Sequence, residues 1–435
     1  MSHSPLLLVL IMVAVLAFTM LAGQWIAFAL GAVGSLILLL TKGFLGLESI
    51  SSIAWNNTNS YVLIAVPLFI LMGELIVRSG AGRNFYSGVA TLMGSARGGL
   101  LHANTVSCAV FAAVSGSSVA TAASVGTVAI PEMLKQGYDK KLVFGSLAAG
   151  GTLGILIPPS LSMVLYGALV GESISHLFIA GIIPGLLLTS IFLIYGFCRI
   201  RLNPSLAPQA SENTRRPSKL AALPQVLPIT ALIVVVLGGI YSGYTTPTEA
   251  AAVGAFGAFV LAACYGRFNW MVCRDSLLST VKLTCMIMFL IVGAQILSAA
   301  LTYSGINKEI TDWILHIGLS KWAFFCVIVI FFLALGMFVD GVSMMFLTLP
   351  VLFPAITAFG FDAVWFGVVL TVLIELGQIT PPVGLNLFTI QAISGGKNFR
   401  DVAMGAAPYC GLILFLLVLL AFFPALATWL PTTIR

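Results

Sequence analysis

The chain consists of long apolar runs separated by short polar segments. A helix needs about 20 apolar residues to cross a bilayer. The pattern predicts eight full membrane spans, at residues 5–22, 25–41, 61–77, 177–197, 225–245, 247–265, 276–302 and 403–430. We therefore expect an all-α protein that crosses a membrane several times.

Two further apolar regions, 97–171 and 320–394, are interrupted by Gly, Ser and paired prolines. Each region predicts a re-entrant hairpin followed by a span that is broken at the proline pair. The first hairpin would cover 97–135 and turn at Ser115–Ser118, and its broken helix would cover 142–170. The second hairpin would cover 320–358 and turn at Asp340–Ser343, and its broken helix would cover 363–394. Segments 82–95 and 307–318 are expected to lie along the membrane surface.

Composition narrows the class of protein. Hydrophobic residues make up 60% of the chain and charged residues 8%, against about 25% charged in a typical soluble domain. This excludes soluble enzymes and nucleic-acid-binding proteins as descriptions of the whole chain. With the N-terminus outside, only four of the 20 Lys and Arg residues fall on the outer side, as the positive-inside rule requires: Lys42, Lys308, Lys321 and Arg435.

The two halves of the chain repeat the same motifs in the same order. Gly116 and Ser118 match Gly341 and Ser343 at an offset of 225, and GILIPPS at 154–160 matches GQITPPV at 377–383 at an offset of 223. We predict a first repeat at 1–198, a cytoplasmic linker at 199–222 and a second repeat at 223–435. The predicted topology gives the repeats opposite orientations, and inverted repeats with interrupted helices are typical of secondary transporters.

The first candidate site combines the hairpin tip SGSS with the break GILIPPS. Ser115, Ser117 and Ser118 supply hydroxyl and backbone groups, while Pro158 and Pro159 free backbone carbonyls that survive in a membrane only against protein or water. Small residues also permit close helix packing without any ligand. Because the polar tip and the break recur together in the second half, we favour a site.

The second candidate site carries two carboxylates at membrane depth, where ionisable groups are functional candidates. Asp340 lies on the hairpin tip and either contributes to a site or caps the second hairpin arm. Glu375 precedes the break and is either functional or a buried structural partner. Sodium takes oxygen ligands of the kinds found here. In a proton-coupled alternative, Asp340 or Glu375 would carry the proton.

Other chemistry has little support in the sequence. There is no G-x-x-x-x-G-K-[ST] motif to bind ATP, the seven cysteines are scattered, and no His is paired in sequence with the tip serines to form a hydrolase. We expect no enzyme activity and no cofactor beyond a coupling ion.

The runs AVSGSSVATAASVGTVAIPEM, GTLGILIPPS and GQITPPVGLNLF resemble the large membrane subunit of tripartite ATP-independent periplasmic (TRAP) transporters. The resemblance covers essentially the whole chain. It implies an elevator-type carrier of the bacterial inner membrane, in which the hairpins and broken helices move against a scaffold formed by the other spans. It also implies two partners, a small four-helix membrane subunit, here a separate chain, and a periplasmic substrate-binding protein.

The resemblance also implies sites for sodium and for an organic acid anion such as a C4-dicarboxylate, sialic acid or another sugar or keto acid. One sodium site would use Ser115, Ser117, Ser118, Gly154, Ile157 and Pro159, and the other Gly336, Asp340, Gly377, Thr380 and Val383. The anion would lie between the two tips, near Ser117, Ser118, Ser160, Gly341, Ser343, Pro382 and Asn386. The competing hypothesis is a stand-alone organic anion carrier of the wider ion-transporter group, driven by protons or sodium.

Overall fold

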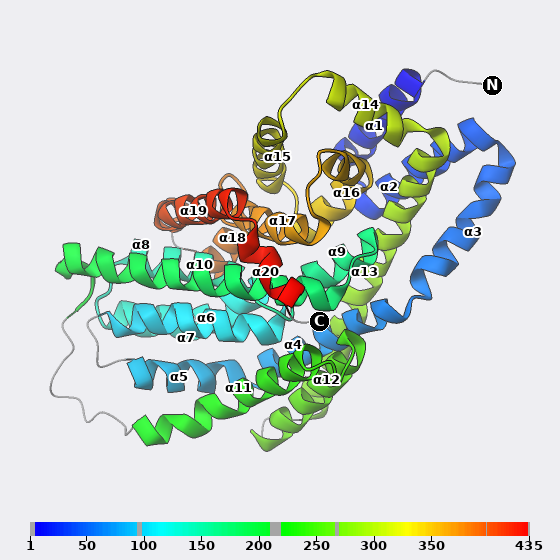
Figure 1. The fold of residues 1–435 in the computed structure, drawn as a ribbon. Coiled ribbons are helices and arrows are strands. Elements are labelled where there is room, and N and C mark those ends of the chain that lie inside the picture. The colour runs from blue at the N-terminus through cyan, green and yellow to red at the C-terminus, as the bar shows by residue number, and fades with distance from the viewer. Residues whose placement is uncertain (1–4, 94–97, 209–218, 266–268, 397, 434–435) are drawn as a thin grey trace.

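The computed structural model describes residues 5–93, 98–208, 219–265, 269–396 and 398–433. In these residues all regular structure is helical, which confirms the predicted all-α class (Figure 1). The first half contains α1 (Pro5–Leu21), α2 (Ile26–Lys42), α3 (Phe44–Thr58), η1 (Tyr61–Ile64), α4 (Ala65–Arg78), α5 (Ala81–Met93), α6 (Gly99–Ser115), α7 (Ser118–Lys135), α8 (Lys140–Leu156), α9 (Leu161–Val170), α10 (Ile174–Leu202) and η2 (Pro204–Leu206).

The second half follows the same order. It contains α11 (Lys219–Tyr241), α12 (Pro247–Cys264), α13 (Trp270–Ser304), α14 (Ile306–His316), α15 (Lys321–Gly336), α16 (Gly341–Ala358), α17 (Ala363–Gln378), α18 (Leu385–Ile393), α19 (Phe399–Phe422) and α20 (Ala425–Thr433). At offsets near 225, α3 and α4 together correspond to the single long helix α13. The repeat boundaries stay a prediction, and linker residues 209–218 lie outside the described residues.

By length and composition, eight helices in the described part of the chain can cross a membrane, or nine if α14 and α15, which meet at 118°, form one span. One helix was not predicted, and one predicted span differs in the structure. Residues 44–58 form α3, which the span pattern missed because this stretch mixes apolar and polar residues. The predicted span 403–430 is divided between α19 and α20, since the residue before Pro424 is disfavoured in a helix.

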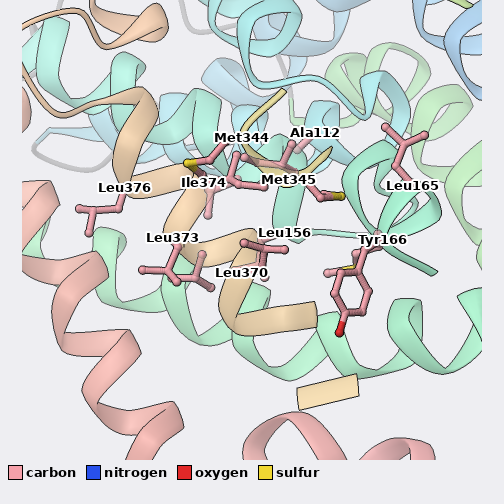
Figure 2. Packing of buried hydrophobic residues seen from close by; sticks show 14 of the residues in the cluster. Ala112, Leu156, Leu165, Tyr166, Met344, Met345, Leu370, Leu373, Ile374 and Leu376 are labelled. Carbon is pink, nitrogen blue, oxygen red and sulfur yellow. The ribbon is translucent and has the colours of Figure 1, made fainter. Parts of the chain in front are cut away.

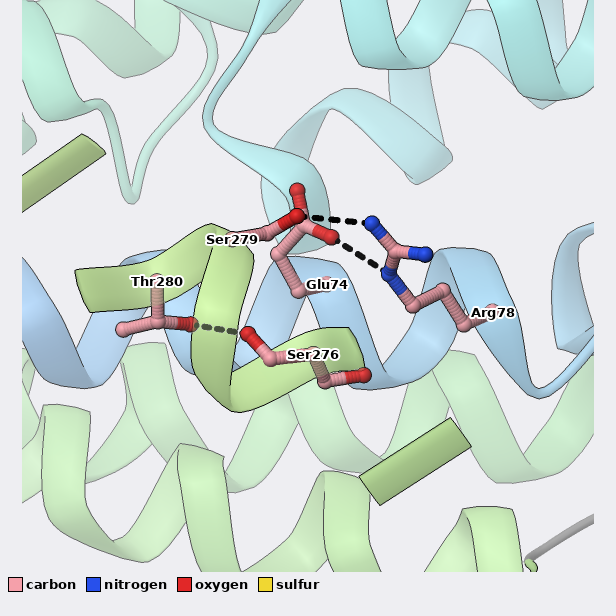
Figure 3. A network of polar contacts seen from close by, with 5 residues as sticks. All are labelled: Glu74, Arg78, Ser276, Ser279 and Thr280. Atoms are coloured by element: carbon pink, nitrogen blue, oxygen red, sulfur yellow. Dashed lines mark hydrogen bonds and ion pairs between the residues drawn. The ribbon is translucent and has the colours of Figure 1, made fainter. Parts of the chain in front are cut away.

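One group of helices forms a scaffold in which α2 packs on α13 and α4 packs on α12. Glycines bring α2 and α13 together, since a Cβ on Gly293 would lie 2.4 Å from the Ala27 carbonyl oxygen. Polar contacts join α4 to α13 (Figure 3). The Arg78 guanidinium pairs with Glu74 at 2.8 Å and donates a hydrogen bond to Ser279 Oγ at 2.7 Å.

The hairpins and broken helices share one hydrophobic core (Figure 2). Its members come from both halves of the chain, including Ala112 of α6, Leu156 of α8, Met344 of α16 and Ile374 of α17. Helices α8 and α9 together form the most enclosed candidate span. In its 18-residue apolar stretch 72% is buried inside the protein, against 22% for the corresponding stretch of α11. The broken helices therefore lie at the centre of the molecule, while α11 presents most of its surface to the surroundings.

We predicted the spans containing α10 and α19 as parts of the scaffold, but the structure packs both on the broken helices. A Cβ on Gly145 of α8 would lie 2.0 Å from the Gly405 carbonyl oxygen of α19, and one on Gly181 of α10 would lie 2.8 Å from that of Leu156. Such close backbone contact joins α10 and α19 to the hairpins and broken helices. We call these ten helices, α6–α10 and α15–α19, the hairpin body.

Candidate functional site

The first hairpin turns over two residues, Gly116 and Ser117. Helix α6 ends at Ser115, Gly116 adopts φ 58°, and Ser117 caps α7 by accepting a hydrogen bond from the Ala120 N–H at 3.4 Å. Glycine suits the turn because other residues rarely adopt a positive φ. The tip therefore forms where SGSS predicted it.

Oxygen atoms gather beside this tip. Ser115 Oγ lies 2.6 Å from Thr121 Oγ1 and donates to the Ser117 carbonyl at 3.2 Å. The broken helix α8 comes close at Gly154, where a Cβ would lie 3.0 Å from the Ser117 carbonyl oxygen and 3.1 Å from Thr121 Oγ1. Hydroxyl and carbonyl oxygens are ligands for a hard cation. The structure thus brings Ser115, Ser117 and Gly154 together, and it adds Thr121, which the sequence analysis did not single out.

The first break lies directly against the tip. Helix α8 ends at Leu156 and α9 begins at Leu161, and a Cβ on Gly116 would lie 3.5 Å from the Pro159 carbonyl oxygen. The hydroxyl of the buried Ser160 donates to the Ile155 carbonyl that the break leaves without a helical partner. Ser160 was predicted to bind substrate, but in this structure its hydroxyl stabilises the break. Ile157 caps α8 and contacts Gly185 of α10.

The second tip is organised differently. Asp340 caps α16 by accepting the Ser343 N–H at Oδ2, 3.1 Å away, which confirms the capping interpretation. Gly336 lies at the end of α15, where an added Cβ atom would lie 2.8 Å from the Gly377 Cα. Two of the predicted second sodium residues therefore touch through their backbones. Gly341 and Ser343 are buried behind Asp340.

The second break is more open than the first. Pro381 and Pro382 are exposed, Val383 is partly buried, and Pro158 and Pro159 are buried. Both proline pairs contain a cis peptide bond. Thr380 Oγ1 donates to the Leu376 carbonyl at 2.6 Å and lies 3.9 Å from Cys410 Sγ. Thr380 therefore lies within the break between α17 and α18, and its role in sodium binding stays a prediction.

Two side chains at the second break donate or accept hydrogen bonds across the halves of the chain. Asn386 was predicted to bind substrate, but it is fully buried and its Nδ2 donates to the Ala148 carbonyl of α8 at 3.1 Å. The Ser118 hydroxyl donates to Gln378 Oε1 at the end of α17. Gln378 is the second residue that sequence reasoning missed. A polar residue beside a proline break in an apolar run was the signal that could have revealed it.

Glu375 is fully buried, and neither carboxylate oxygen has a hydrogen-bond partner among the described residues. The described residues thus supply no partner for Glu375, and both interpretations of this carboxylate stay predictions. Its repeat counterpart Thr152 donates to the Ala149 carbonyl at 2.8 Å and needs no other partner.

Comparison with known proteins identifies relatives over the whole length. The family model described as "Tripartite ATP-independent periplasmic transporter, DctM component" matches residues 10–426. The C4-dicarboxylate TRAP transporter large permease protein DctM of Pseudomonas aeruginosa is 38% identical over 412 residues, 93% of each chain. The isethionate TRAP transporter permease protein DctMQ of Oleidesulfovibrio alaskensis is 29% identical over 94% of this chain and 64% of its own length.

Among solved structures, the crystal structure of the YdaH transporter of Alcanivorax borkumensis is similar with a TM-score of 0.63. The alignment covers 98% of this chain and 100% of that one at 16% sequence identity. At this identity the likeness is one of fold alone.

Proposed function

The chain belongs to the DctM component family of tripartite ATP-independent periplasmic transporters, and from this premise we propose that it imports an organic acid anion together with sodium ions. It is a multi-pass inner-membrane permease subunit and not an enzyme. A C4-dicarboxylate is the first candidate substrate, because the relative that is 38% identical is named for this class. Sialic acid and other sugar or keto acids are the further candidates.

The observation that supports sodium coupling is the meeting of tip and break in each half. In the first half, Ser115 Oγ, the Ser117 carbonyl and Thr121 Oγ1 face Gly154. In the second, Gly336 lies against Gly377, one turn from Thr380. Each cluster offers oxygen atoms without a basic side chain, which is the donor set that a sodium ion takes. One sodium ion in each half is the simplest arrangement.

The mechanism that we propose is movement of the hairpin body against the scaffold. The two bodies meet at the first tip, where a Cβ on Gly73 of α4 would lie 3.0 Å from the Ser115 carbonyl oxygen. Because Gly73 has no side chain, no atom projects from α4 at this point to obstruct the movement of the tip. The anion would lie between the two tips and cross the membrane with them.

Two partners complete the proposed system. A periplasmic binding protein would deliver the anion, and a small four-helix membrane subunit would pack on the scaffold. The relative named DctMQ is longer than this chain, which covers 64% of it. Purification of the chain with the products of neighbouring genes tests this part, and a chain that transports fully by itself would contradict it.

The decisive experiment is uptake in proteoliposomes that contain both membrane subunits, with substrate-loaded binding protein outside. Labelled succinate should accumulate when an inward sodium gradient is imposed. Accumulation that is the same with potassium in place of sodium would contradict the proposed coupling.

A further inference from the structure

Gln378 reaches from the second half of the chain to both hairpin tips. It is the last residue of α17, and its Oε1 accepts a hydrogen bond from the hydroxyl of Ser118, the first residue of α7. Its Nε2 points to the other tip, since a Cβ on Gly341 would lie 3.3 Å from this nitrogen. One carboxamide therefore lies between the tips, with its oxygen toward the first and its nitrogen toward the second.

The two ends of this carboxamide differ in their partners. The oxygen is held by Ser118, whereas among the described residues the nitrogen donates to no protein acceptor. Ser118 is buried and Gln378 is only partly buried, so the side chain whose oxygen Ser118 holds is not sealed inside the protein. A hydroxyl donor on the oxygen orients the N–H groups toward the space between the tips.

The hairpins and broken helices carry few cationic side chains near the tips. Residues 98–134, 142–198 and 322–396, which include both tips and both breaks, contain no Lys or Arg. Within these segments, an anion between the tips would be bound mainly by neutral N–H and O–H donors and by the coupled cations. A carboxamide N–H is such a donor, and hydrogen bonds to charged groups are about twice as strong as those between neutral groups.

We propose that Gln378 contacts the substrate and determines specificity, with Nε2 donating a hydrogen bond to a carboxylate oxygen of the organic acid and with Ser118 holding the amide in position. This inference rests on the proposed function. The repeat counterpart of Gln378 in GILIPPS is the apolar Ile155. The two halves would therefore bind the carboxylate asymmetrically, with the amide supplied only by the second half.

The alternative role for Gln378 is a link between the halves that never touches substrate. Three variants separate the two roles. Gln378→Leu removes both ends of the amide, Ser118→Ala removes only the orienting hydroxyl, and Gln378→Glu keeps an oxygen for Ser118 but replaces the free N–H groups by a negative charge. Gln391→Leu on α18 is the matched control, since no side-chain hydrogen bond of Gln391 is present in the described structure.

The assay is uptake of labelled succinate by proteoliposomes with both membrane subunits and increasing concentrations of loaded binding protein. We expect Gln378→Leu to lower the maximal rate at least about 10-fold, as loss of a hydrogen bond to a charged group predicts. Gln378→Glu should be slower still, Ser118→Ala should fall between Gln378→Leu and wild type, and the half-saturating concentration of binding protein should not change.

Two results would overturn the proposal. One is a maximal rate of Gln378→Leu within twofold of the wild type. The other is near-normal uptake by Gln378→Glu together with equal losses in Gln378→Leu and Ser118→Ala, which is the pattern of a link. Failure of the proposed sodium coupling would appear separately, as wild-type uptake that does not respond to sodium, and the comparison of variants in one buffer would still apply.

Discussion

The contact between Gly336 and Gly377 gives a quantitative prediction about sodium affinity. In Gly377→Ala the new methyl group would lie 2.8 Å from the Gly336 Cα. Carbon atoms rest at about 3.5–4.0 Å, so α15 and α17 must separate by roughly 0.7 Å. Overpacking of this kind costs about 1–3 kcal/mol. Because the proposed second sodium site is built from these two backbones, the separation should weaken ion binding.

If the whole cost falls on the sodium-bound state, the half-saturating sodium concentration rises about 5- to 150-fold. The assay is the initial rate of sodium-driven uptake in proteoliposomes at a saturating concentration of loaded binding protein. Gly411→Ala on α19 is the matched control, because no atom lies within 4 Å of its Cβ position. That variant should keep the wild-type sodium dependence.

A separate measurement distinguishes weaker sodium binding from misfolding of the variant. Thermal unfolding of the purified Gly377→Ala protein should show a weaker stabilisation by sodium than the wild type, because at a given concentration a ligand that binds more weakly stabilises the folded state less. A Gly377→Ala protein that folds normally and has wild-type sodium dependence would refute the placement of the ion between α15 and α17.

Four further outcomes follow from the described contacts. Thr380→Ala should raise the half-saturating sodium concentration about 10-fold while Thr380→Ser does not, and equal behaviour of the two would exclude a role for the hydroxyl. Gly73→Val should slow uptake at least about 10-fold through overpacking against the first tip, with sodium stabilisation intact; normal uptake would place the sliding contact elsewhere. Glu375→Gln should keep sodium-driven uptake, whereas loss of uptake together with its pH dependence would favour the proton-coupled alternative. Gly145→Ala should lower the melting temperature by several degrees, since its Cβ would lie 2.0 Å from a backbone oxygen, and an unchanged value would contradict the close packing of α8 on α19.

Much of the fold could be predicted because bilayer thickness and backbone chemistry leave few choices. The long apolar runs located most of the helices, and the SGSS tip turns at the predicted residues because glycine supplies the positive φ. Helix α3 escaped prediction because the hydrophobicity pattern does not separate a mixed helix from a loop. The place of α10 and α19 in the hairpin body also escaped, since it depends on glycine contacts between distant segments, such as Gly145 and Gly405.

The candidate site, like the fold, could be predicted from the sequence only in part. Motif matching grouped Ser115, Ser117 and Gly154, which the structure brings together. It predicted that Asn386 binds substrate, whereas in the structure this side chain donates a hydrogen bond to the Ala148 carbonyl of the other half. Local sequence shows which polar residues lie near a break, but not which of them already have a partner in the fold. Gln378 was missed for the same reason, because its neighbours Ser118 and Gly341 are distant in the chain.

In the proposed mechanism a sodium gradient drives the organic anion through this permease. The most direct test is succinate accumulation in proteoliposomes of the two-subunit membrane complex with its loaded binding protein, with sodium and proton gradients imposed one at a time. We expect accumulation against a concentration gradient with the sodium gradient alone and none with the proton gradient alone. Accumulation driven by the proton gradient in sodium-free buffer would contradict it.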